Sequence, residues 1–211
     1  MTKPAAPLPG LAELADVLRP APDWAAVHGR FGGWLRTGPD LLGLLRTDLR
    51  RLTAEQSAAL AAGSSEVTTH FAWRLRDEPT DPFSFWLHEY KPLRDWLPGY
   101  ANTVHNHRYD FCTTVLVGGY WHEWFQVELD PNGELVRDAR SAGSQTFRPG
   151  TVCMVTADRF HRIPRAKDGT ITFLVKSRPV KGWSLSFDPV TRVSRRHVPV
   201  EVRVGDLARR L

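Results

Sequence analysis

Residues 103–119, TVHNHRYDFCTTVLVGG, decide the fold prediction for this chain. Two histidines, His105 and His107, stand one residue apart, and a β-branched apolar run and two glycines follow them. Side chains alternate between the two faces of a strand, so this spacing directs both imidazoles to the same side. Two neutral imidazoles that converge from a rigid strand supply a large part of a transition-metal site.

A third ligand has to come from another strand, and His161 is the candidate. It lies in ADRFHRIP, residues 157–164, directly after an apolar strand predicted over residues 151–156. Strands far apart in the sequence become neighbours in an antiparallel barrel, so His161 can join His105 and His107 in a three-histidine face. The alternative is a loop histidine that bonds to the backbone.

The residue pattern after Gly63 favours a β-fold. Short strands alternate with turn residues, and DPNGE at residues 130–134 is a strong hairpin signal. Further strands are predicted over residues 66–76, 83–90, 124–129, 135–137, 171–176, 183–187 and 198–204. Strands do not alternate with helices here, which favours a closed or double-sheet β-fold over a parallel sheet.

The residues before Gly63 predict four helices. The first ends at Pro20, a second begins at a cap, Asp23, and ends at the glycine pair of residues 32–33, and a third spans residues 39–49. Thr53 caps the fourth. We therefore expect a helical extension over residues 1–64 that covers one end of a barrel over residues 65–204, with a tail over residues 205–211.

Composition excludes several classes of function. The chain has 211 residues, a formal charge of +5 and two cysteines, and its arginines are scattered. We expect no nucleic-acid partner and read the positive surplus as a basic pocket for an anionic small molecule. No apolar run reaches the ~20 residues of a membrane span, and no signal-peptide core precedes the helices. A cytoplasmic monomer or homodimer is expected.

Two motifs carry a family resemblance. WLPGY at residues 96–100, the two histidines, Cys112 and the glycine pair form the first, and FHRI at residues 160–163 forms the second. Together they resemble the cupin superfamily over residues 66–190 and are most similar to its cysteine dioxygenase and thiol dioxygenase branch. The resemblance implies a jelly-roll barrel in which His105, His107 and His161 hold Fe(II), or another divalent metal. It also implies dioxygen and a small organic acid, amino acid or amine as substrates.

The chain departs from that family at Cys112 and after the second motif. Most cupins place a glutamate ligand where Cys112 stands. Cys112 is opposite in parity to His107, so it is either a catalytic thiol brought inward by a bulge or a small buried hydrophobe. The Ser-His-Tyr relay of thiol dioxygenases falls on Thr172, Leu174 and Lys176. The relay and a cysteine–tyrosine crosslink are therefore absent, which argues against cysteine as the substrate.

Substrate anchors are sought on the strand at residues 66–76. Arg74 or Arg76 lies where the family carries its carboxylate-binding arginine, and a guanidinium binds a carboxylate through two hydrogen bonds. Asp110 has two interpretations: it orients a histidine, or it bonds to loop backbone.

Aromatic residues and two further histidines complete the candidate site. Tyr109, Tyr120 and Trp124 suggest a pocket for a substrate larger or more apolar than cysteine. His88 and His122 are either functional groups or satisfied core histidines. We take Tyr109 and His122 as catalytic candidates, and Tyr120, Trp124 and His88 as substrate-binding candidates.

Three functions fit these patterns. The leading one is a non-heme Fe(II) oxygenase. The second is an isomerase or lyase that uses its metal as a Lewis acid. The third is a ligand-binding cupin without catalysis, in which the aromatic lining is the whole function.

Overall fold

Four helices precede the strands in this computed structural model, which describes residues 8–210. Residues 1–7 of the predicted extension and residue 211 of the predicted tail lie outside that range. The helices are α1 (Gly10–Leu18), α2 (Trp24–Thr37), α3 (Leu41–Arg50) and α4 (Ala54–Gly63). Asp23 caps α2 by accepting a hydrogen bond from the backbone of Ala26, and Thr53 caps α4 in a capping box with Gln56. Both predicted caps are confirmed.

Within residues 8–210, twelve strands form two antiparallel six-stranded sheets. The first sheet has the order β1 (Ser65–Glu66), β2 (His70–Arg76), β3 (Phe83–Tyr90), β10 (Ile171–Ser177), β5 (Phe111–Val117) and β8 (Val152–Val155). The second sheet has the order β12 (Ser194–His197), β11 (Ser184–Phe187), β4 (Val104–His105), β9 (Phe160–Ala166), β6 (Tyr120–Leu129) and β7 (Val136–Phe147).

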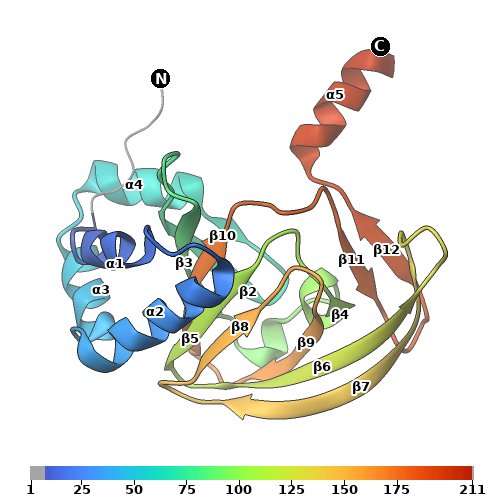
Figure 1. The fold of residues 1–211 in the computed structure, drawn as a ribbon, viewed down its shortest axis with the longest axis horizontal. Helices are drawn as coiled ribbons and strands as arrows, with labels where there is room; N and C mark the ends of the chain where they lie inside the picture. Colours follow the sequence, from blue (N-terminus) through green and yellow to red (C-terminus); the bar gives the residue numbers. More distant parts are fainter. Residues whose placement is uncertain (1–7, 211) are drawn as a thin grey trace.

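The chain passes from one sheet to the other after each of β3, β4, β5, β7, β8, β9 and β10. This repeated crossing makes a double-sheet jelly roll, in which the inner faces of both sheets enclose a common interior. The mainly β fold with an N-terminal helical extension confirms the predicted fold class (Figure 1).

The helices cover the outer face of the first sheet. Phe31 of α2 contacts Phe173 of β10, with ring centroids 5.9 Å apart, and both side chains are fully buried. The first sheet is therefore buried on both faces, as the nearly continuous apolar sequence of β10 indicates. The inner face of this sheet, opposite the helices, lines the space between the two sheets.

Two predictions of secondary structure are wrong. Helix α2 does not end at the glycine pair but continues to Thr37, because Phe31 and Trp34 on either side of the pair are buried in the core. The predicted strand over residues 198–204 is instead the start of α5 (Val200–Arg210), which extends away from the barrel (Figure 1).

No helix within residues 8–210 is long and apolar enough to cross a membrane.

Candidate metal centre

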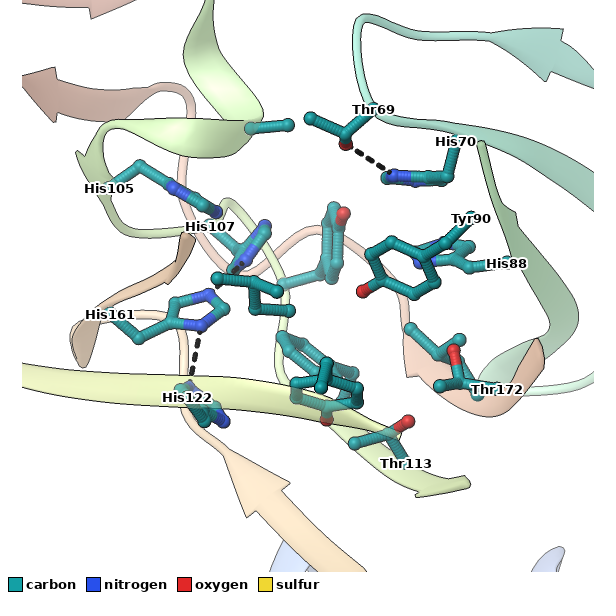
Figure 2. Close-up of a pocket in the computed structure, with 16 residues that line it drawn as sticks. Thr69, His70, His88, Tyr90, His105, His107, Thr113, His122, His161 and Thr172 are labelled. Carbon is teal, nitrogen blue, oxygen red and sulfur yellow. Dashed lines mark hydrogen bonds between the residues drawn. The ribbon is translucent and has the colours of Figure 1, made fainter. Parts of the chain in front are cut away.

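Three histidines converge inside the barrel, two of them on strands of the second sheet and one on the loop after β4. His105 on β4 and His161 on β9 are cross-strand partners, and His107 follows β4 by two residues. One ring nitrogen from each lies within 4.8 Å of the others, and Nε2 of His107 lies 2.8 Å from Nε2 of His161. Figure 2 shows the three rings on one side of the interior. The predicted meeting of His161 with the two earlier histidines is confirmed.

Hydrogen bonds fix which nitrogen faces inward. Nδ1 of His105 donates to the backbone carbonyl of Thr103 at 2.8 Å, which leaves Nε2 free. Nδ1 of His161 lies 2.8 Å from Nε2 of His122 on β6, so Nε2 of His161 also points toward the centre. Partners of this kind set the tautomer of a metal-binding histidine.

Burial keeps the imidazoles neutral. It lowers the pKa of His105 to about 4 and lowers the pKa values of His107 and His161 well below their ordinary value. A neutral imidazole has the lone pair that a metal needs, so the donor set fits a divalent transition metal. Three protein ligands leave coordination positions open.

The loops around the triad are held by buried polar residues. Asn106, between the two histidines, accepts a hydrogen bond from the backbone of Leu185 on β11 at 2.7 Å. Asp110 accepts one from the backbone of Ala157 at 2.6 Å. Of the two interpretations of Asp110, the structure therefore supports bonding to loop backbone.

A cavity of about 60 Å³ adjoins the triad. One water needs about 10–15 Å³ on this measure, so the cavity has room for a small molecule of a few non-hydrogen atoms. Besides the three histidines and His122, its lining consists of Thr69, His70, His88, Tyr90, Ala101, Tyr109, Phe111, Thr113, Tyr120, Ile163, Thr172 and Leu174.

Four candidates from the sequence lie in this lining. They are Tyr109, Tyr120, His88 and His122. Burial raises the pKa of Tyr109 to about 12, so its phenol stays protonated beside His107, with ring centroids 5.1 Å apart. Their roles in binding or catalysis stay predictions.

The two arginine candidates do not reach the cavity. Arg74 pairs with Asp77 at 3.2 Å, and Arg76 pairs with Asp81 at 2.9 Å. A register shift between β2 and β3 at this point ends the regular alternation that the prediction assumed. Neither guanidinium belongs to the lining, so this cavity does not support the expected basic anchor for a substrate carboxylate.

Trp124 and Cys112 also do not belong to the lining. Trp124 stacks on His122, which does line the cavity, with ring centroids 4.1 Å apart. Cys112 stands between Phe111 and Thr113, which line the cavity, so strand alternation turns its thiol to the helix-covered face. It is fully buried, and burial raises its pKa to about 12. Of the two alternatives, a catalytic thiol and a small buried hydrophobe, the structure supports the buried hydrophobe for Cys112.

Sequence reasoning missed His70 and Lys176. The alternation of β2 puts His70 on the same face as Arg74, but the family resemblance drew attention to the arginines. Thr172 and Leu174, two of the three absent relay positions, line the cavity. The third, Lys176, places its ammonium over the rings of Tyr109 and Trp86, 4.0 and 4.4 Å from their centroids.

No protein-family model matches the sequence, and no curated protein matches it significantly. Similar solved structures include hydroquinone 1,2-dioxygenase PnpCD, with 10% identity, a TM-score of 0.36, and 51% of this chain and 63% of that chain covered. Bacillus subtilis oxalate decarboxylase has 15% identity and a TM-score of 0.38, with 69% and 34% covered. Drosophila melanogaster CENP-C bound to CAL1 has 12% identity and a TM-score of 0.37, with 54% and 75% covered. Because one architecture hosts unrelated functions, the site has to carry the functional argument.

Proposed function

We propose that this protein is a non-heme Fe(II)-dependent oxygenase that acts on a small organic molecule and dioxygen. The supporting observation is the convergence of three neutral imidazoles, two of them buried and one partly buried, on a small cavity between the sheets. His105, His107 and His161 would hold the metal, and its remaining coordination positions would be open toward the cavity. Fe(II) bound there would supply the electron-transfer chemistry that dioxygen requires.

The other residues of the site act by orientation and exclusion of water. His122 positions His161 through their ring nitrogens, 2.8 Å apart. Tyr109 presents a protonated phenol beside His107. This phenol would donate a hydrogen bond to a bound substrate. Phe111, Ile163 and Leu174 contribute apolar walls, which raise the strength of polar interactions inside the cavity.

Metal analysis tests the site assignment. Protein loaded anaerobically with Fe(II) should contain one iron per chain, and the His105→Ala and His161→Ala variants should lose most of it. His28→Ala, which removes a histidine on α2 outside the cavity, is the matched control and should keep its iron. Full iron occupancy in both site variants would show the assignment to be wrong.

Nitric oxide, a surrogate for dioxygen, tests the oxygenase reaction class. The iron-loaded protein should give the electron paramagnetic resonance signal of an iron–nitrosyl with spin 3/2. Firmly held iron that gives no such signal, together with no oxygen consumption across a panel of small substrates, would favour the non-redox isomerase or lyase.

A further inference from the structure

Two more histidines face the metal centre across the cavity. His70 on β2 and His88 on β3 stack with ring centroids 4.1 Å apart and an interplanar angle of 26°. They belong to the first sheet, whereas the triad belongs to the second, and Figure 2 shows the two groups on opposite sides of the interior. His70 pairs with Tyr90, and Ala72 with His88, so the two rings meet on the diagonal between neighbouring strands.

The ring nitrogens of this pair are available to a ligand. Nδ1 of His70 lies 2.9 Å from the hydroxyl of buried Thr69, the one side-chain partner that this hydroxyl has within residues 8–210. Thr69 either donates to Nδ1, which places the proton of His70 on Nε2, or accepts from Nδ1–H, which leaves a lone pair on Nε2. Nε2 of His70 and both ring nitrogens of His88 make no hydrogen bond to a described residue, and both rings line the cavity. Polar groups in a cavity cost free energy until a partner binds them.

The described part of the lining carries no charged side chain, and the ammonium of Lys176 lies outside it, over the rings of Tyr109 and Trp86. Burial lowers the pKa of His70 to about 3 and that of His88 well below its ordinary value, so both rings are neutral at pH 7. Among the described residues of the lining there is no Asp, Glu, Lys or Arg. An ammonium bound beside these rings would be buried without an opposite charge, which is costly, and a carboxylate has no proton to donate to an imidazole lone pair. A hydroxyl both donates and accepts, and so satisfies an imidazole N–H and an imidazole lone pair together.

We propose that His70 and His88 bind a hydroxyl group of the substrate, so that the substrate is a small hydroxyl-bearing molecule whose end far from the metal is uncharged. This inference rests on the proposed function, because the metal at His105, His107 and His161 holds the other end. It replaces the expected basic anchor with an uncharged one.

Four matched thiols test the proposal on protein loaded with Co(II). Each binds the metal through its thiolate and differs at the far end: 2-mercaptoethanol carries a hydroxyl, cysteamine an ammonium, thioglycolate a carboxylate and 1-propanethiol a methyl group. Dissociation constants come from the cobalt–thiolate absorption band, so the readout needs no turnover. We expect 2-mercaptoethanol to bind at least about tenfold more tightly than each of the other three.

The variants His70→Phe and His88→Phe should lose the preference for hydroxyl over methyl while keeping their cobalt. His28→Phe, outside the cavity, should keep the preference. Equal or tighter binding of cysteamine or thioglycolate to the wild type, or a preference that survives in both variants, would overturn the proposal while the metal site stands. A wild type that takes up no cobalt and no iron overturns the proposed function first, and this inference with it.

Discussion

Nδ1 of His161 and Nε2 of His122 lie 2.8 Å apart, and the other nitrogen of His122 is buried without a hydrogen-bond partner among the described residues. When Nε2 of His161 binds a metal, its proton sits on Nδ1 and is donated to Nε2 of His122. The proton of His122 then occupies the unpartnered Nδ1, which costs about 1–3 kcal/mol. A metal on Nε2 of His161 would therefore require His122 as the acceptor of the Nδ1 proton.

Replacing His122 with Phe should weaken metal binding by about 10–100-fold, the usual effect of removing the partner of a metal-bound histidine. The Phe ring keeps the stack on Trp124, so the fold should be retained. Competition against a chelator measures the affinity. Trp124→Phe is the control, because it leaves the His122–His161 contact in place. Unchanged affinity in His122→Phe would mean that His122 is a core residue.

The pH dependence of stability should report the buried state of His70. Its pKa falls from 6.5 to about 3 in the folded protein. Between these values the unfolded chain binds a proton that the folded protein excludes, so stability falls as the pH drops, by up to ~1.4 kcal/mol per pH unit. Urea unfolding of metal-free protein from pH 7 to pH 4 should therefore give a shallower decline in His70→Phe than in the wild type. Parallel curves would contradict the assignment.

Local chemistry explains what could be predicted from the sequence. The predicted strand at residues 83–90 matches β3, because its apolar and aromatic residues lie between a Pro-rich turn and Lys91-Pro92. The side-chain caps at Asp23 and Thr53 act within one turn, so no tertiary information is needed to find them. His161 was found because it lies just after an apolar strand, in an FHRI sequence that resembles the second metal motif of the cupin superfamily.

The missed features depend on packing that the sequence does not display. Phe31 and Trp34 bury α2 against the barrel strongly enough to carry it through two glycines. The valines at alternate positions from residue 198 to 204 gave a strand pattern, yet α5 begins at the second of them, Val200. Which of His70 and Arg74 enters the cavity depends on how far along β2 the cavity extends, and that is visible only in three dimensions.

Cys112 should be dispensable for the site. Its thiol is fully buried against the helices, so Cys112→Ala should lower the free energy of unfolding by about 1–2 kcal/mol and leave metal content unchanged. In native protein a thiol reagent should label Cys153, which is partly exposed, faster than Cys112. Loss of oxygenase activity in a folded, iron-loaded Cys112→Ala variant would restore a catalytic role for this thiol.

Lys176 should be the lysine with the lowest pKa that the structure describes. Burial, with Arg108 nearby, lowers its pKa from 10.5 to about 8. Titration of ¹³C-methylated lysines by NMR should show one resonance with a midpoint near pH 8. That resonance should disappear in Lys176→Met and persist in Lys167→Met, which removes an exposed lysine. If the resonance that disappears in Lys176→Met had its midpoint near pH 10.5, the ammonium of Lys176 would not be buried.

We expect Asp110 to affect metal affinity only through its hydrogen bond to the backbone of Ala157. Its carboxylate binds the N–H of Ala157 at 2.6 Å, and the carbonyl of Ala157 accepts from the N–H of His107 at 3.3 Å. Ala157 therefore ties the start of β9, and with it His161, to the loop that carries His107. Asp110→Ala leaves the N–H of Ala157 without its acceptor, which should destabilise the protein by about 1–3 kcal/mol and weaken metal binding. Asp110→Asn keeps an oxygen acceptor and should lie closer to the wild type on both measures. If Asp110→Ala lost stability but bound metal as tightly as the wild type, this loop would not set the position of His161.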